Sequence, residues 1–286
     1  MEKIADLSQK VVDAIISCKN EKWEADQLGQ AYVNQLLRED VLDILDKYCT
    51  VIYFPLEEED NNGFHITGIL DRAGNSKHFV FINTSQTMEK QVFTAAHELG
   101  HIWKVDEYVE KALGISLEPQ QRESVINRFS AELLMPHEIF KAAFYLEYAH
   151  VEKIEKGQIT VENALKLAVT MMNQFFVPYK SIILRFLELG FVAKPSVKLL
   201  LGAGTIPYEV IQERVSALIH ERGLIKFETA SKKRWIAGLA DLLNEAEAKE
   251  TVSQSKIDSL RKEFGLQHIE PNTRMDEILD IGADKE

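Results

Sequence analysis

The strongest constraint on the fold of this chain is a helical pattern between Thr87 and Trp103. Apolar or small residues recur there three or four positions apart: Val92, Ala96, Leu99 and Trp103. This spacing predicts an amphipathic helix whose apolar stripe packs against a core. His97 and His101 lie on a different face of that helix, one turn apart.

The spacing of the two histidines favours a metal site. Residues four apart on a helix lie one above the other, so the imidazoles of His97 and His101 can converge on one ion about 2 Å from each nitrogen. Glu98 projects beside them, where it can accept a proton from an attacking water and pass it to a leaving amine. An amphipathic helix with two surface histidines is the alternative, but the small residues Ala95 and Ala96 and the preceding strand-like runs favour a Zn2+ site with Glu98 as general base.

Two histidines leave a catalytic zinc one protein ligand short. Glu123 follows His101 by 22 residues on a second predicted helix, and we expect it to be the third ligand. Asn127 lies one turn further on the same face, and we expect it to hydrogen-bond the free imidazole nitrogen of one histidine. Three acidic residues closer to the first helix are rivals for the third position: Asp106, Glu107 and Glu110. Each of them would require the chain to fold back at once.

Strand-like runs precede the histidine pair at 49–56, 64–70 and 78–83. The second and third runs flank turn residues at 71–76 and predict a β-hairpin. The run at 78–83 directly precedes the histidine helix, and we expect it to form a sheet edge beside which a peptide substrate binds in an extended conformation.

Helices are predicted at 4–18, 26–47 and 120–134, the last because Pro136 disfavours helical geometry at the residue before it. Beyond residue 150 the pattern is helical, with a break at Gly202-Ala-Gly204. The expected fold class is α+β: a small antiparallel sheet packed with a zincin-like helical core, followed by an all-helical C-terminal region.

A chain of 286 residues exceeds the usual size of one compact domain. We expect a zincin-like metallopeptidase domain over 1–150, a helix-turn-helix-like packing subdomain over 151–203 and a helical accessory region over 204–286. The accessory region is expected either to bind or position a partner, or to bury its apolar residues against the catalytic domain. In 161–191 a DNA-binding helix-turn-helix is the alternative, but only Lys180 and Arg185 would face phosphate, so packing is favoured.

The composition fits an ordinary globular protein, with 45% apolar and 27% charged residues. A formal net charge of -12 disfavours direct binding to nucleic acid or an anionic membrane. Cys18 and Cys49 are the only cysteines, too few for a disulfide framework, which fits a reducing compartment. Because the N-terminus lacks signal-peptide order and no segment offers about 18 uninterrupted apolar residues, we expect a cytoplasmic protein without a membrane span.

Two blocks of the chain together resemble the ImmA/IrrE family of metallopeptidases: Phe93-Thr-Ala-Ala-His-Glu-Leu-Gly-His101, and Glu123-Ser-Val-Ile-Asn-Arg-Phe-Ser-Ala-Glu-Leu-Leu-Met-Pro136. The resemblance implies a compact zinc peptidase. It also implies a protein substrate, since the characterised members cut repressor proteins that silence mobile elements or stress-response genes. It places the two histidine ligands on His97 and His101, the base on Glu98 and the later ligand on Glu123. Two positions depart from the family pattern: Lys104 stands where many members have another histidine, and Ile126 replaces the usual small residue before the asparagine.

The expected function is that of a zinc-dependent endopeptidase. It would hydrolyse a peptide bond in a specific intracellular protein, a repressor-like DNA-binding protein of a mobile element or stress response. The alternative is a catalytically weak regulatory or binding protein that uses the same fold to sense a ligand or partner. The intact Glu98 favours the enzyme, because a binding protein would have no need of a base.

Overall fold

The computed structural model describes residues 7–26, 36–56, 63–70, 76–152 and 159–266. By packing, the chain divides into two compact units, Met1–Lys233 and Arg234–Glu286. Part of the predicted helix at 26–47 and most of the predicted hairpin turn lie outside the described residues. The functional division into 1–150, 151–203 and 204–286 stays a prediction.

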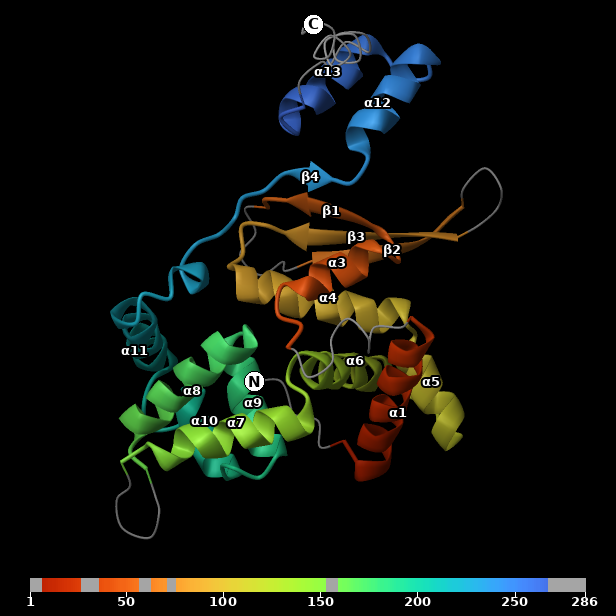
Figure 1. Cartoon of the computed structure of the whole chain (residues 1–286). Helices are drawn as coiled ribbons and strands as arrows, with labels where there is room; N and C mark the ends of the chain where they lie inside the picture. The colour runs from red at the N-terminus through yellow and green to blue at the C-terminus, as the bar shows by residue number, and fades with distance from the viewer. Residues whose placement is uncertain (1–6, 27–35, 57–62, 71–75, 153–158, 267–286) are drawn as a thin grey trace, which may run out of the picture. The chain divides into compact units, whose positions relative to one another are not determined.

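The elements follow one another along the chain as labelled in Figure 1. Those of the first unit are α1 (Gln9–Ala25), α3 (Asp40–Asp46), β1 (Thr50–Phe54), β2 (Gly63–Leu70), β3 (Ser76–Asn83), α4 (Met88–Ile102), α5 (Val105–Leu113), α6 (Pro119–Leu134), α7 (His137–Ala149), α8 (Val161–Phe175), α9 (Tyr179–Glu188), α10 (Lys194–Leu200), α11 (Tyr208–Glu221) and the short 3-10 helix η2 (Ile225–Phe227). Those of the second unit are β4 (Trp235–Ile236), α12 (Leu239–Ala248) and α13 (Gln254–Glu263).

The sheet of the first unit has the strand order β2-β3-β1. β2 and β3 are antiparallel, with Phe64 opposite Phe81, so the predicted hairpin pairing is confirmed. β1 and β3 are parallel, with Ile52 opposite Phe81. The α+β class with a helical C-terminal region is therefore confirmed, but the sheet is mixed rather than antiparallel. Alternating apolar residues identify strands without identifying their neighbours, because side chains alternate between faces in both kinds of pairing.

β3 is an interior strand, since it pairs with β2 on one side and with β1 on the other. The prediction that 78–83 forms a sheet edge and receives substrate is therefore wrong: both of its hydrogen-bonding sides are already paired. Among the described strands of the first unit, β2 lies at an edge and pairs with β3 alone.

Helix α4 lies between the sheet and α6 (Figure 1). Its apolar stripe is fully buried at Val92, Ala96 and Leu99, as the periodicity predicts. On the side of α6, a Cβ added at Gly100 would lie 2.8 Å from Phe129 and 3.1 Å from Ile126. The glycine next to His101 therefore permits α4 and α6 to approach closely.

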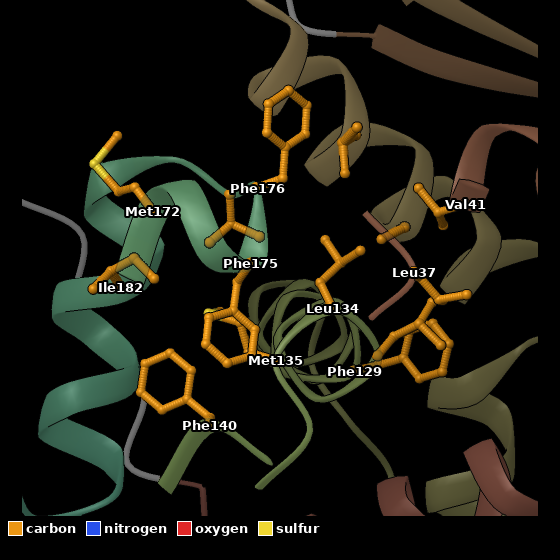
Figure 2. Close-up of a cluster of buried hydrophobic side chains, with 14 of the residues drawn as sticks. Leu37, Val41, Phe129, Leu134, Met135, Phe140, Met172, Phe175, Phe176 and Ile182 are labelled. Carbon is orange, nitrogen blue, oxygen red and sulfur yellow. The ribbon is translucent and has the colours of Figure 1, made fainter. Parts of the chain in front are cut away.

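The helices after residue 150 share a core with the helices before it. The ring of Phe140 in α7 lies 4.9 Å from that of Phe175 in α8 and 5.9 Å from that of Phe186 in α9. Figure 2 shows Phe140 and Phe175 near Met135, which follows α6. This contact surface supports the packing role expected for 151–203.

The chain between α10 and residue 233 also packs within the first unit. Arg214 of α11 donates to both carboxylate oxygens of Glu162 in α8, and Phe227 of η2 packs edge-on against Phe176 at 5.1 Å. Further on, the Lys232 amide donates to the Thr84 carbonyl at 2.9 Å. This part of the accessory region is thus integrated with the sheet and its helices.

In the second unit, α12 and α13 pack through Leu243 and Ile257, and Arg261 of α13 reaches Glu247 of α12 at 2.7 Å. In the part of the chain that the structure describes, no helix is both long enough and apolar enough to span a membrane.

Candidate metal centre

His97 and His101 lie on the face of α4 that is not part of its buried stripe. Their side chains are 20% and 18% exposed, so both are largely enclosed but accessible. The two Nε2 atoms are 3.2 Å apart, and the rings meet at an interplanar angle of 70°. Helical spacing thus aims one nitrogen of each ring at the same point.

Glu123 reaches the same point from α6. Its Oε2 atom lies 3.3 Å from Nε2 of His97, and its Oε1 atom lies 3.6 Å from Nε2 of His101. The side chain is 54% exposed, so the site is open on this side. Within the described ranges, these three residues form a group whose ligand atoms all lie within 4.8 Å of one another.

The geometry of this group fits a tetrahedral ion. Ligands about 2.05 Å from a tetrahedral zinc lie ~3.3 Å from one another. The two Nε2 atoms are 3.2 Å apart, Oε2 of Glu123 lies 3.3 Å from that of His97, and its other oxygen, Oε1, lies 3.6 Å from that of His101. Three protein ligands and an open fourth position are the arrangement of catalytic zinc sites. The donor set of two imidazoles and one carboxylate therefore suits zinc.

Asn127 contacts the histidine pair from the next turn of α6. Its Oδ1 atom lies 3.1 Å from Nδ1 of His97. In this pairing Nδ1 donates its proton to the amide oxygen, which leaves Nε2 of His97 without a proton and able to bind a metal.

The three acidic rivals of Glu123 are paired elsewhere. Asp106 and Glu110 both accept hydrogen bonds from the guanidinium of Arg122, at 2.8 and 2.6 Å. Glu107 accepts from Lys104 at 3.3 Å. None of the three belongs to the histidine group in the structure.

Comparison with known proteins matches residues 46–186 to the IrrE N-terminal-like domain, peptidase family M78. The matched range contains α4, α6 and the whole histidine–glutamate group. This stretch of the chain belongs to the ImmA/IrrE-type family. No curated protein matches the chain. Among solved structures, a Mycobacterium tuberculosis transcriptional regulator is similar to 61% of this chain and 46% of its own length, with a TM-score of 0.39 and 12% identity. The family match over residues 46–186 makes this domain metallopeptidase-like.

The two departures from the ImmA/IrrE pattern are not members of the group of three candidate ligands. Lys104 follows the end of α4 in a left-handed conformation, with φ 55°, and its side chain is exposed beside Glu107. Ile126 is fully buried and packs against the backbone of α4 near Gly100.

Glu98 directly follows His97 in α4 and is only 4% exposed. Burial, Asp46 and then the charge of Glu98 raise the pKa of the Cys49 thiol to about 12. Burial likewise raises the pKa of Cys18 to about 11. Both cysteines are therefore neutral thiols near pH 7, and neither is a thiolate ligand of the kind that zinc prefers.

The position of Arg185 contradicts the helix-turn-helix interpretation of 161–191, which requires this side chain to face phosphate. The Arg185 side chain is completely buried and donates to Glu132, Glu188 and the carbonyl of Met135. It cannot face a phosphate. Sequence patterning missed this role, because a cation at a helical position is usually on the surface.

Proposed function

We propose that this ImmA/IrrE-type chain is a zinc-dependent endopeptidase that hydrolyses a peptide bond in a specific intracellular protein. The observation that supports it best is the convergence of His97, His101 and Glu123 at tetrahedral spacing, next to a buried Glu98. The chemistry follows from these four side chains and not from the fold alone.

His97, His101 and Glu123 would hold the zinc ion, and Asn127 would keep His97 in the tautomer that binds it. When bound, zinc would polarise the substrate carbonyl and make a water molecule more acidic. Glu98 would accept the proton of that attacking water and then donate it to the leaving amine. Its low exposure limits competition from bulk water for this proton.

The free edge of β2 is the strand position at which an extended substrate can pair. Gly63 in β2 lies against α4: a Cβ added there would come within 2.7 Å of Thr94 Cγ2. Thr94 precedes His97 by one helical turn, so this end of β2 is close to the metal-binding part of α4. Main-chain hydrogen bonds to an edge strand hold a peptide extended without selecting its sequence.

The proposed substrate is a repressor-like DNA-binding protein in the cytoplasm, which is what the family resemblance implies. The net charge of -12 favours a protein partner over direct contact with nucleic acid. Zinc as the metal, the site roles of the five residues and the cytoplasmic location belong to the same proposal.

The alternative function is that of a regulatory protein that binds a partner without cutting it. Glu98→Gln separates the two functions, with Glu89→Gln as the matched control. Glu89 is also a buried glutamate of α4, but it lies two turns before the histidines. The test measures cleavage of a repressor-like DNA-binding protein by the zinc-loaded variants.

For the enzyme, Glu98→Gln retains zinc and loses about 10²–10⁴-fold in cleavage rate, the range for a general acid–base group. Glu89→Gln cleaves normally. Cleavage that persists in zinc-loaded Glu98→Gln would contradict the proposed mechanism, and binding of the repressor without any cleavage by wild type would favour the alternative.

A further inference from the structure

The third metal-binding residue lies in a part of α6 that needs external support. Glu123 belongs to the second turn of the helix, and its side chain is half exposed. The first turns of a helix have unpaired N–H groups and fray readily. A capping box between Glu118 and Gln121, together with Pro119, stabilises the very start of α6. These contacts stabilise the helix but do not fix its position relative to α4.

Arg122, the residue before Glu123, fixes the start of α6 relative to α5. Its guanidinium donates to Asp106 at 2.8 Å, to Glu110 at 2.6 Å and to the carbonyl of Leu117 at 3.2 Å. Glu110 also accepts the amide of Leu117 at 2.7 Å. One planar group is thus bonded to α5 and to the connection between α5 and α6.

α5 is in turn fixed to the end of α4. Only Trp103 and Lys104 separate the two helices, and Trp103 is almost completely buried. Its ring packs edge-on against Phe129 of α6 at 5.7 Å. The two acids that hold Arg122 therefore belong to the element that directly follows His101.

We propose that Arg122 is a positioning residue that holds Glu123 at the distance from His97 and His101 which metal binding requires. It acts through the backbone of α6 and through α5, without touching the three ligand groups. Asn127 connects the two helices at the site itself, whereas Arg122 connects them at the entrance to α6. The inference rests on the proposed function, since it assumes that these three residues bind zinc.

The test is the zinc affinity of the full chain, measured by competition with a chelating indicator. For Arg122→Gln we expect affinity to fall by about tenfold or more, as for other groups that orient metal ligands. The control is Arg214→Gln. Arg214 is exposed to the same degree, 34%, and also binds two carboxylates, Glu162 and Glu221, but on α8 and α11. This control should bind zinc like wild type.

Two further variants separate positioning from general stability. Arg122→Lys keeps one charge without the planar fork and should recover part of the affinity. Asp106→Asn should weaken zinc binding, and combined with Arg122→Gln it should weaken it no further, because both changes break the same contact.

Zinc affinity of Arg122→Gln equal to that of wild type would overturn the inference and leave the proposed function standing. The same holds if Arg122→Gln and Arg214→Gln lower the melting temperature alike and neither changes affinity. A wild-type chain that does not bind zinc would overturn both.

Discussion

At the scale of single residues, each acidic rival of Glu123 pairs with a cationic side chain outside the histidine group. The convergence of His97 and His101 could be predicted from their spacing on one helix, because helical geometry fixes which side chains meet. Glu123 is the third ligand that the sequence predicts, with Asp106, Glu107 and Glu110 as rivals. What distinguishes them is Arg122, which pairs with Asp106 and Glu110 and leaves its neighbour Glu123 facing the histidines. Such a choice depends on tertiary contacts that no local pattern contains.

The ligand choice predicts a sharp contrast between two exposed glutamates. Glu123→Gln should weaken zinc binding at least about 100-fold, beyond the effect of losing a supporting group. Glu107→Gln, which removes only the carboxylate beside Lys104, should leave zinc affinity unchanged. Titration with zinc against a competing chelator measures both. Loss of zinc in Glu107→Gln with retention in Glu123→Gln would show that the third ligand is misassigned.

At the scale of elements, the helices that position the site could be predicted and the order of the strands could not. The apolar stripe of α4 and the proline after α6 specify both helices locally. The position of β3 between β1 and β2 depends on long-range pairing. Edge strands and interior strands can show the same alternation of side chains, so the sequence pattern does not distinguish them. Alternation alone therefore could not show that β3 has both of its sides paired.

The proposed pairing of substrate with the edge of β2 predicts different effects of proline at two adjacent positions. Successive N–H groups of a strand point to opposite sides, so one of His65 and Ile66 directs its N–H at β3 and the other at the free edge. Proline at the residue whose N–H points to β3 should destabilise the protein. Proline at the residue whose N–H points to the free edge should leave stability and zinc content intact while impairing repressor cleavage. Full cleavage by both folded variants would exclude β2 as the substrate strand.

A buried ionic cluster centred on Glu132 joins α6 to α9 and α1. Glu132 lies 2.8 Å from Arg185, 3.2 Å from Arg128 and 3.6 Å from Lys19. Burial alone would raise the pKa of Glu132, but Arg185, Lys19 and Arg128 lower it below its ordinary value of 4.5. Glu132→Gln leaves these cations without their shared partner, and should destabilise the protein by about 3–5 kcal/mol at pH 7.

The pH dependence of this effect has a definite sign. A carboxylate whose folded pKa is depressed stabilises the fold above pH 4.5, and that contribution disappears as the pH falls through the folded pKa. The difference in unfolding free energy between wild type and Glu132→Gln should therefore be constant near neutral pH and shrink below pH 4.5. Urea unfolding between pH 3 and pH 7 measures it, and a difference that grows on acidification would contradict the account.

At the scale of the whole molecule, the boundary between packing units lies after Lys233 and not near the glycine pair at 202–204. Glycines indicate a break in secondary structure, but they do not show whether the next helix returns to the same core. Here α11 and η2 do return, through Arg214 and Phe227. The segment after them is held to the residue that follows β3 by hydrogen bonds of Lys232 and Lys233 with Thr84.

Two truncations test this boundary. A chain that ends at Lys233 should keep the melting temperature and zinc affinity of the full chain. A chain that ends at Ala203 should melt at least about 10 °C lower, since loss of a buried phenylalanine alone costs about 3–5 kcal/mol. If the shorter chain is as stable as the longer one, residues 204–233 are not part of the first unit. If the chain that ends at Lys233 keeps its stability and zinc affinity but loses repressor cleavage, the second unit serves recognition.

The measurement that tests the metal centre most directly is anomalous diffraction at the zinc absorption edge from crystals of the full chain. The account predicts a single strong peak about 2.0–2.2 Å from Nε2 of His97, Nε2 of His101 and a carboxylate oxygen of Glu123. Zinc-saturated crystals without a peak between α4 and α6, or with a peak held by a different set of side chains, would contradict it.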